Sequence, residues 1–127
     1  MEKVKIIGGG LAGTEAALYL AKKGIKVTLY DVKPKSFSPA HKSGNFAELV
    51  CSNSLKSNDV YGNAAGLLKE EMRILGSEVI AAADKTRVPA GNALAVDREA
   101  FSSLLTERIK SESNITVVCE EISEINF

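Results

Sequence analysis

The sequence predicts an α/β protein built on a parallel sheet, and three observations near its N-terminus lead to this prediction. Residues 3–7 form a short strand pattern that runs directly into three glycines spaced Gly-x-Gly-x-x-Gly. A helix pattern rich in Ala and Leu follows over 11–23, and a second strand pattern over 25–30 ends at Asp31. Strand, glycine turn, helix and strand in this order are typical of a Rossmann-like dinucleotide-binding unit.

Each glycine of the motif has a separate predicted role. Gly8 permits the tight turn from strand to helix, Gly10 lets the backbone approach a phosphate, and Gly13 lets the helix pack closely on the strand. Asp31 follows Gly13 by 18 residues, where an acid accepts a hydrogen bond from an adenosine ribose hydroxyl. The residues expected to hold the cofactor at the turn are consecutive: Gly8, Gly9, Gly10, Leu11, Ala12 and Gly13.

The remainder of the chain alternates helix and strand patterns after a long polar connection over 32–60. The apolar stretch 46–50 is expected to anchor this inserted loop at its middle. Asp97 is a suitable N-cap for a helix over 98–111. The other expected elements are a helix over 62–75, an ambiguous helix or strand over 79–83, a turn over 89–92, and strands over 93–96, 115–119 and 121–127.

Length and composition limit the classes of protein that the chain can belong to. The 127 residues suit one domain, and 16 basic against 16 acidic side chains give no argument for a polyanionic partner. The sequence has neither an apolar run long enough for a membrane span nor a signal peptide. Cys51 and Cys119 lack metal-type spacing, so reduced thiols, no bound metal and a cytoplasmic location are expected.

Cys51 lies in the inserted loop, which follows the expected ribose-binding acid. A loop in this place is aimed near the distal half of an extended dinucleotide, which suits FAD better than NAD. Nearby basic groups at His41, Lys42 and Lys56 would favour the thiolate of a nucleophilic Cys51. A small buried cysteine is the alternative, because Val50 precedes it.

Five segments occur together and in order: 7–17 (IGGGLAGTEAA), 39–42 (PAHK), 46–54 (FAELVCSNS), 66–72 (GLLKEEM) and 87–99 (RVPAGNALAVDRE). With them the chain closely resembles the N-terminal part of the TrmFO (Gid) family, the folate- and FAD-dependent tRNA (uracil-5-)-methyltransferases. The resemblance covers nearly the whole chain. It implies that 1–127 is the N-terminal part of an FAD-binding domain, apparently truncated, with the rest of the enzyme absent.

The resemblance also implies a reaction and roles for single residues. Members methylate C5 of uridine in the T-loop of tRNA, using 5,10-methylenetetrahydrofolate as carbon source, FAD as mediator and NAD(P)H as electron source. Cys51 matches the cysteine that takes part in covalent chemistry, and Arg98, in segment 87–99, is expected to reach toward cofactor or RNA. Ile122 lies where related FAD domains contact adenine through the backbone. Members usually carry Glu in place of Asp31, and the shorter acid changes the reach to the ribose.

Three alternatives stay open at the level of sequence. A paralogous enzyme that methylates ribosomal RNA uses the same cofactors, and the residues present do not distinguish the two substrates. A nucleotide-binding module without catalysis would need no role for Cys51. An ordinary NAD-linked dehydrogenase fits less well, because the long cysteine-bearing insertion follows Asp31.

Overall fold

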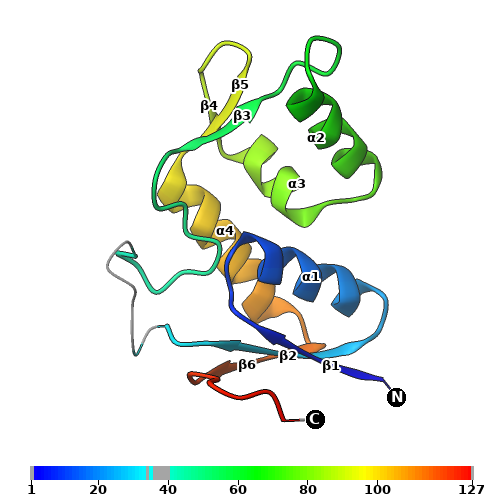
Figure 1. Ribbon diagram of the computed structural model, residues 1–127, viewed down its shortest axis with the longest axis vertical. Helices are drawn as coiled ribbons and strands as arrows, with labels where there is room; N and C mark the ends of the chain where they lie inside the picture. Colours follow the sequence, from blue (N-terminus) through cyan, green and yellow to red (C-terminus); the bar gives the residue numbers. More distant parts are fainter. Residues whose placement is uncertain (1, 34, 36–40, 127) are drawn as a thin grey trace.

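The structure is a computed structural model that describes residues 2–33, 35 and 41–126. Its elements form two lobes, one around a parallel sheet and one around a small antiparallel sheet (Figure 1). Among the described residues, no helix has the length and apolar character needed to cross a membrane.

The first lobe contains the predicted dinucleotide-binding unit. Strands β1 (Lys3–Ile7), β2 (Lys26–Asp31) and β6 (Ile115–Cys119) pair in parallel in the order β1-β2-β6. Helices α1 (Leu11–Lys22) and α4 (Arg98–Ser111) cover one face of this sheet (Figure 1). The predicted parallel sheet is therefore confirmed, with β6 added beside β2.

Local signals in the sequence explain where these helices begin and end. Gly24 has a φ of +81°, a left-handed conformation that glycine adopts without strain, and it follows the last turn of α1. The Asp97 carboxylate accepts a hydrogen bond from the backbone N–H of Ala100 at 3.0 Å, which confirms the predicted N-cap of α4. The core between the sheet and the two helices includes fully buried Ala17, Leu29, Phe101, Leu105 and Ile109.

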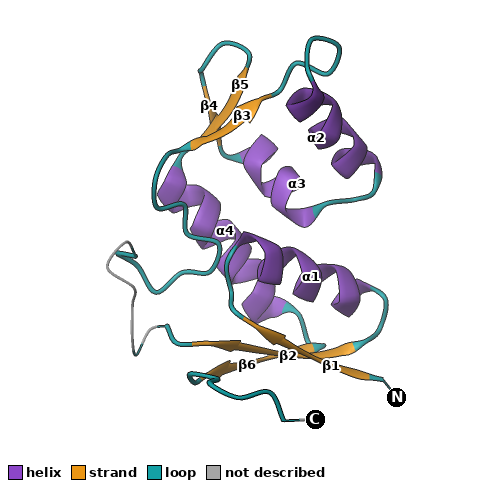
Figure 2. Ribbon diagram, viewed as in Figure 1, coloured by secondary structure: helices purple, strands orange, loops and turns teal. Residues whose placement is uncertain are grey.

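The second lobe is made by the middle of the chain. Strands β3 (Ser54–Ser57), β5 (Ala93–Val96) and β4 (Arg87–Val88) form an antiparallel sheet in the order β3-β5-β4 (Figure 2). Helices α2 (Ala64–Ile74) and α3 (Glu78–Lys85) lie beside it. The ambiguous segment 79–83 is helical, and strand β3 corrects the prediction of a connection without regular structure over the whole of 32–60.

Helix α3 is fastened to α1 and α4 by two carboxylates. Glu15 of α1 accepts hydrogen bonds from the Ser77 hydroxyl and from the backbone N–H groups of Glu78 (2.8 Å) and Val79 (3.1 Å). Glu78, whose side chain is 4% exposed, pairs in turn with Lys22 of α1 and with Arg108 of α4. The first turn of α3 is thereby linked to both helices of the first lobe.

The strand expected over 121–127 is not formed by the described residues 121–126. The last backbone hydrogen bond to the sheet runs from Glu120 N–H to the Asp31 carbonyl at 2.9 Å. The chain then passes beneath the sheet (Figure 1), where Ile122 lies near Ile7 and Tyr30. An alternating pattern makes a strand only when it meets a free sheet edge, and this segment meets the face of the sheet instead.

Candidate cofactor and cysteine site

The glycine turn has the geometry that its spacing predicts. Gly8 adopts a φ of +99°, and its N–H donates to the Tyr30 carbonyl at 2.7 Å. A Cβ added to Gly13 would lie 1.8 Å from the Gly8 carbonyl oxygen, so only glycine permits this approach of α1 to the turn. A Cβ on Gly10 would meet nothing within 4 Å. The conformational roles of Gly8 and Gly13 are therefore confirmed, and the approach of a phosphate to the open space at Gly10 stays a prediction.

The beginning of α1 suits an anion. Its N-cap is Gly10, which offers no side chain to accept hydrogen bonds from the first-turn N–H groups that start at Leu11 and Ala12. Such N–H groups, together with the helix dipole, favour a phosphate at the helix end. Binding of a dinucleotide by these residues remains a prediction.

Asp31 stands at the end of β2 with its carboxylate already oriented. Oδ2 accepts a hydrogen bond from Gly9 N–H at 2.6 Å, and Oδ1 accepts one from Lys33 N–H at 2.9 Å. A carboxylate offers about four acceptor positions, so each oxygen retains capacity for a further donor. A ribose hydroxyl is such a donor, and this predicted role of Asp31 is untested by the structure.

The inserted loop is attached to the glycine turn, which sequence reasoning did not foresee. Ala47 N–H donates to the Gly9 carbonyl at 2.8 Å, and Phe46 is 4% exposed. A Cβ on Gly9 would lie 2.3 Å from the Phe46 ring and 2.8 Å from Asp31 Oδ2. The apolar stretch 46–50 contained the signal for an anchor, as predicted, but Gly9 is a variable position of the motif and gave no sign of being its partner.

A buried ion pair closes the base of the same loop. Lys33 Nζ lies 2.7 Å from Glu48 Oε1, and both side chains are largely buried. Burial by itself raises the pKa of Glu48. Hydrogen bonds from Lys33 and from the backbone N–H groups of Lys42 and Ser43 outweigh that effect and hold this pKa below its ordinary value. The anchor thus depends on an ionised Glu48.

Cys51 is exposed and lines a polar pocket of about 510 Å³ together with Asn53 and Arg98. Arg98 is the first residue of α4 and also lines an adjoining pocket with Lys42 and Glu48. The structure therefore brings Cys51 and Arg98 to one cavity, as candidate residues of a single site. The alternative of a buried Cys51 is wrong, because the side chain faces solvent.

The basic neighbours expected for Cys51 are arranged differently from the prediction. Arg98 is the cation that lines its pocket, whereas Lys42 lines the adjoining one. Residues 39 and 40 of the matching segment 39–42 lie outside the described residues. Cys119 is partly buried, with Sγ 3.4 Å from the Val32 carbonyl oxygen, in agreement with its strand position.

Ile122 lies apart from Cys51 in the fold. It lines a pocket of about 360 Å³ beneath the sheet with Tyr30 and Glu120, beside the end of β2 that carries Asp31. That position is compatible with an adenine contact, which remains a prediction. Among the residues that the structure describes, no group of three or more His, Cys, Asp or Glu side chains is placed to hold a metal ion.

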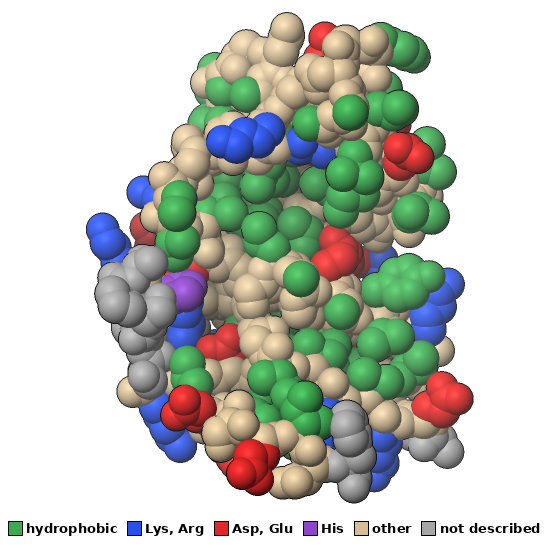
Figure 3. Space-filling view, in the orientation of Figure 1, with side chains coloured by type: hydrophobic (Ala, Val, Ile, Leu, Met, Phe, Trp, Pro, Cys, Tyr) green, Lys and Arg blue, Asp and Glu red, His purple; other side chains and the backbone are tan. Residues whose placement is uncertain are grey.

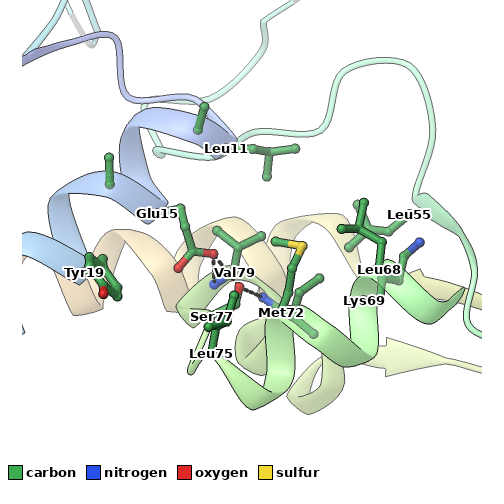
Figure 4. A pocket seen from close by; sticks show the side chains of 13 residues that line it. Leu11, Glu15, Tyr19, Leu55, Leu68, Lys69, Met72, Leu75, Ser77 and Val79 are labelled. Atoms are coloured by element: carbon green, nitrogen blue, oxygen red, sulfur yellow. Dashed lines mark hydrogen bonds between the residues drawn. The ribbon is translucent and has the colours of Figure 1, made fainter. Parts of the chain in front are cut away.

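An apolar pocket of about 740 Å³ is lined by residues of α1, α2 and the start of α3. Hydrophobic side chains gather around it in the space-filling view (Figure 3), and Leu11, Leu68 and Met72 line it with Glu15 at its wall (Figure 4). Leu68 and Leu75 are 58% and 76% exposed. The apolar side of the predicted helix over 62–75 is therefore mostly open to solvent.

The parallel β1-β2-β6 sheet, the glycine turn and the oriented acid together define a protein of the Rossmann-like fold class. A family model described as glucose inhibited division protein A matches residues 3–127, and the chain belongs to that family.

Curated relatives point in the same direction. The chain is 58% identical over 125 residues to a protein of Acetivibrio thermocellus, and 57% identical over 124 residues to one of Bacillus subtilis. Both are named methylenetetrahydrofolate–tRNA-(uracil-5-)-methyltransferase TrmFO. The match covers 98% of this chain but only 28% of each relative, so the chain spans less than a third of their length.

Solved structures share the fold at low sequence identity. Aquifex aeolicus GidA matches with a TM-score of 0.72 and 22% identity, over 94% of this chain and 19% of that one. A mutant of P. aeruginosa PqsL matches with a TM-score of 0.53 and 14% identity, over 92% of this chain and 33% of that one. These likenesses support the fold assignment.

Proposed function

We propose that this chain is the FAD-binding N-terminal part of an enzyme that methylates C5 of uridine in the T-loop of tRNA. The observation that carries the proposal is one arrangement: a loop bearing an exposed cysteine is attached directly to the glycine turn of a dinucleotide-binding unit. The names of relatives at 57–58% identity support the same reaction.

The residues of the first lobe fit the adenosine and pyrophosphate parts of FAD. The backbone from Gly10 into the first turn of α1 would hold the phosphates, and Asp31 would accept a hydrogen bond from the ribose. Bound FAD would supply the redox chemistry, with NAD(P)H as electron source and 5,10-methylenetetrahydrofolate as one-carbon donor. In this proposal Ile122 contributes a backbone contact near adenine.

Cys51 is the proposed nucleophile toward the substrate. C5 of uracil is a weak nucleophile, and attack of a thiolate on C6 raises electron density at C5. Arg98 lines the same pocket as Cys51, where its guanidinium would offer a positive charge to a bound substrate or cofactor.

The names of the relatives support tRNA over ribosomal RNA as substrate, and an enzyme over a nucleotide-binding module without catalysis. A tRNA-modifying enzyme is expected in the cytoplasm, where its substrate and folate donor occur. The matched segments 46–54 and 87–99, which supply Cys51 and Arg98, argue against an ordinary NAD-linked dehydrogenase.

Two measurements test the proposal. Titration of a full-length apoenzyme that carries this sequence with FAD, followed by quenching of flavin fluorescence, should give saturable binding, and the absence of binding would contradict the cofactor assignment. In a full-length enzyme that carries this sequence, C51A should abolish 5-methyluridine formation while the flavin is retained. The matched control C119S should keep activity, and full activity of C51A would remove Cys51 from the mechanism.

A further inference from the structure

The inserted loop is held against α4 by a buried hydroxyl. Phe46 N–H donates to Thr106 Oγ1 at 2.8 Å, and Phe46 and Thr106 are 4% and 6% exposed. A buried N–H that loses its acceptor is costly, so this contact fixes the loop more firmly than a surface contact would. Asn45 adds weaker hydrogen bonds from its side chain to the hydroxyls of Ser102 (3.3 Å) and Ser103 (3.2 Å).

Phe46 and the next residue, Ala47, contact the glycine turn. Ala47 N–H donates to the Gly9 carbonyl, and the Phe46 ring occupies the space that a Cβ on Gly9 would need. Ala47 has a φ of +54°, which alanine adopts only when its surroundings hold it there. Gly9 N–H in turn orients Asp31. A continuous series of contacts therefore runs from α4 through the loop to the acid at the predicted ribose site.

The loop is fixed again on the far side of Cys51. The Asn53 carbonyl accepts a hydrogen bond from Val96 N–H at 2.9 Å, which joins the loop to β5. Cys51 thus lies in a short span between the attachment at Phe46 and Ala47 and the attachment at Asn53. The position of Phe46 therefore limits the positions that the Cys51 thiol can occupy.

From these contacts we infer that Thr106 is a positioning residue, whose hydroxyl seats the inserted loop on the glycine turn and so sets both the Gly9 backbone and the start of the span that carries Cys51. The inference deepens the proposed function and rests on it for the roles of FAD and Cys51. The seating of the loop itself rests only on contacts in the chain. Thr106 touches neither cofactor nor substrate in this assignment.

The test compares T106V with T106S. Valine keeps the volume and removes the acceptor, whereas serine keeps the acceptor and removes a methyl group. In T106V, backbone amide exchange should accelerate about tenfold at Phe46 and Ala47, the effect of one lost buried hydrogen bond, and Gly9 should follow. T106S should stay within about twofold of the wild-type chain, because the hydroxyl still accepts the bond. T116V, at an exposed position of β6, is the matched control and should change none of these amides.

The second measurement is FAD affinity. It should fall about tenfold in T106V and recover in T106S, since the loss of seating is transmitted through Gly9 to the cofactor turn. Acceleration at Phe46 with Gly9 and FAD affinity unchanged would overturn the inference, as would equal behaviour of T106V and T106S. If a full-length enzyme that carries this sequence binds no FAD, the cofactor assignment fails, and the exchange rates at Gly9 still decide the seating.

A further variant covers the case in which T106V does not fold. N45A removes only the outer hydrogen bonds of the loop to α4 and leaves the buried core intact. It should raise exchange at Phe46 and Ala47 by about twofold to fivefold, with the amides of α3 unchanged. A rise of about tenfold or more at Phe46 and Ala47 in N45A would show that the outer bonds rather than the Thr106 hydroxyl hold the loop, and would contradict the inference.

Discussion

One added methyl group should have different effects at two glycines of the same turn: at Gly13 it should lower stability, and at Gly10 it should prevent FAD binding. In G13A the new Cβ would lie 1.8 Å from the Gly8 carbonyl oxygen and 3.0 Å from its carbon. These are backbone atoms in a turn fixed by the hydrogen bond of Gly8 N–H to Tyr30. The turn cannot yield as a flexible side chain would, so α1 must withdraw from it by more than an ångström.

The loss of stability in G13A can be estimated from the side chains that α1 buries. Ala17, Leu18 and Ala21 are 0%, 3% and 3% exposed, and withdrawal of the helix loosens all three. Overpacking of a core costs about 1–3 kcal/mol, and a clash with backbone belongs at the upper end. A loss of about 3 kcal/mol in a domain of this size lowers Tm by about 10 °C.

The matched variant G10A should show the reverse pattern. Its Cβ meets nothing within 4 Å, and exchange of glycine for alanine at an N-cap costs less than about 1 kcal/mol. FAD binding should nevertheless be lost, because the methyl group occupies the approach of the phosphates. Thermal unfolding by circular dichroism and FAD titration measure the two effects. A Tm of G13A within about 2 °C of wild type, or normal FAD binding by G10A, would refute the reasoning.

Two further predictions concern buried carboxylates. E78Q removes the negative charge that pairs with both Lys22 and Arg108. It should lower the free energy of unfolding, measured in urea, by about 1–3 kcal/mol. Equal stability of E78Q and wild type would show that the two ion pairs contribute nothing. The folded-state pKa of Glu48 lies below its unfolded value, so its stabilising effect is complete above about pH 4.3 and is lost as the pH falls through the lower folded pKa. Thermal unfolding from pH 7 to pH 3 should therefore show a steeper acid loss in wild type than in E48Q, and parallel curves would contradict the role of the Lys33–Glu48 pair.

The first lobe could be predicted from sequence because its signals are local. The glycine spacing fixes the turn, Gly24 ends α1, and Asp97 begins α4, each through contacts within a few residues. Strand β6 was recognisable from five consecutive β-favouring residues over 115–119. These elements need no knowledge of distant partners, and the structure confirms them within about one or two residues, the ordinary uncertainty of element ends.

The second lobe and the site were less predictable for the opposite reason. Strand β3 exists because Ser54 and Ser57 pair with residues of β5, about forty residues later. The attachment of Phe46 to Thr106 joins residues 60 apart, and no local pattern marks Gly9 as the partner of the inserted loop. Sequence reasoning placed Cys51 and Arg98 in separate segments, and only the fold brings them to one pocket.

Glu15 and Glu78 join the start of α3, in the second lobe, to the helices of the first lobe. Glu15 and Lys22 are seven residues apart on α1, so their backbone positions lie about 10 Å apart along that helix. Both side chains contact the start of α3. Arg108 of α4 supplies a third point off that line. All of these contacts meet the second lobe at the first turn of α3, so a change in that turn would loosen the second lobe from both helices of the first lobe.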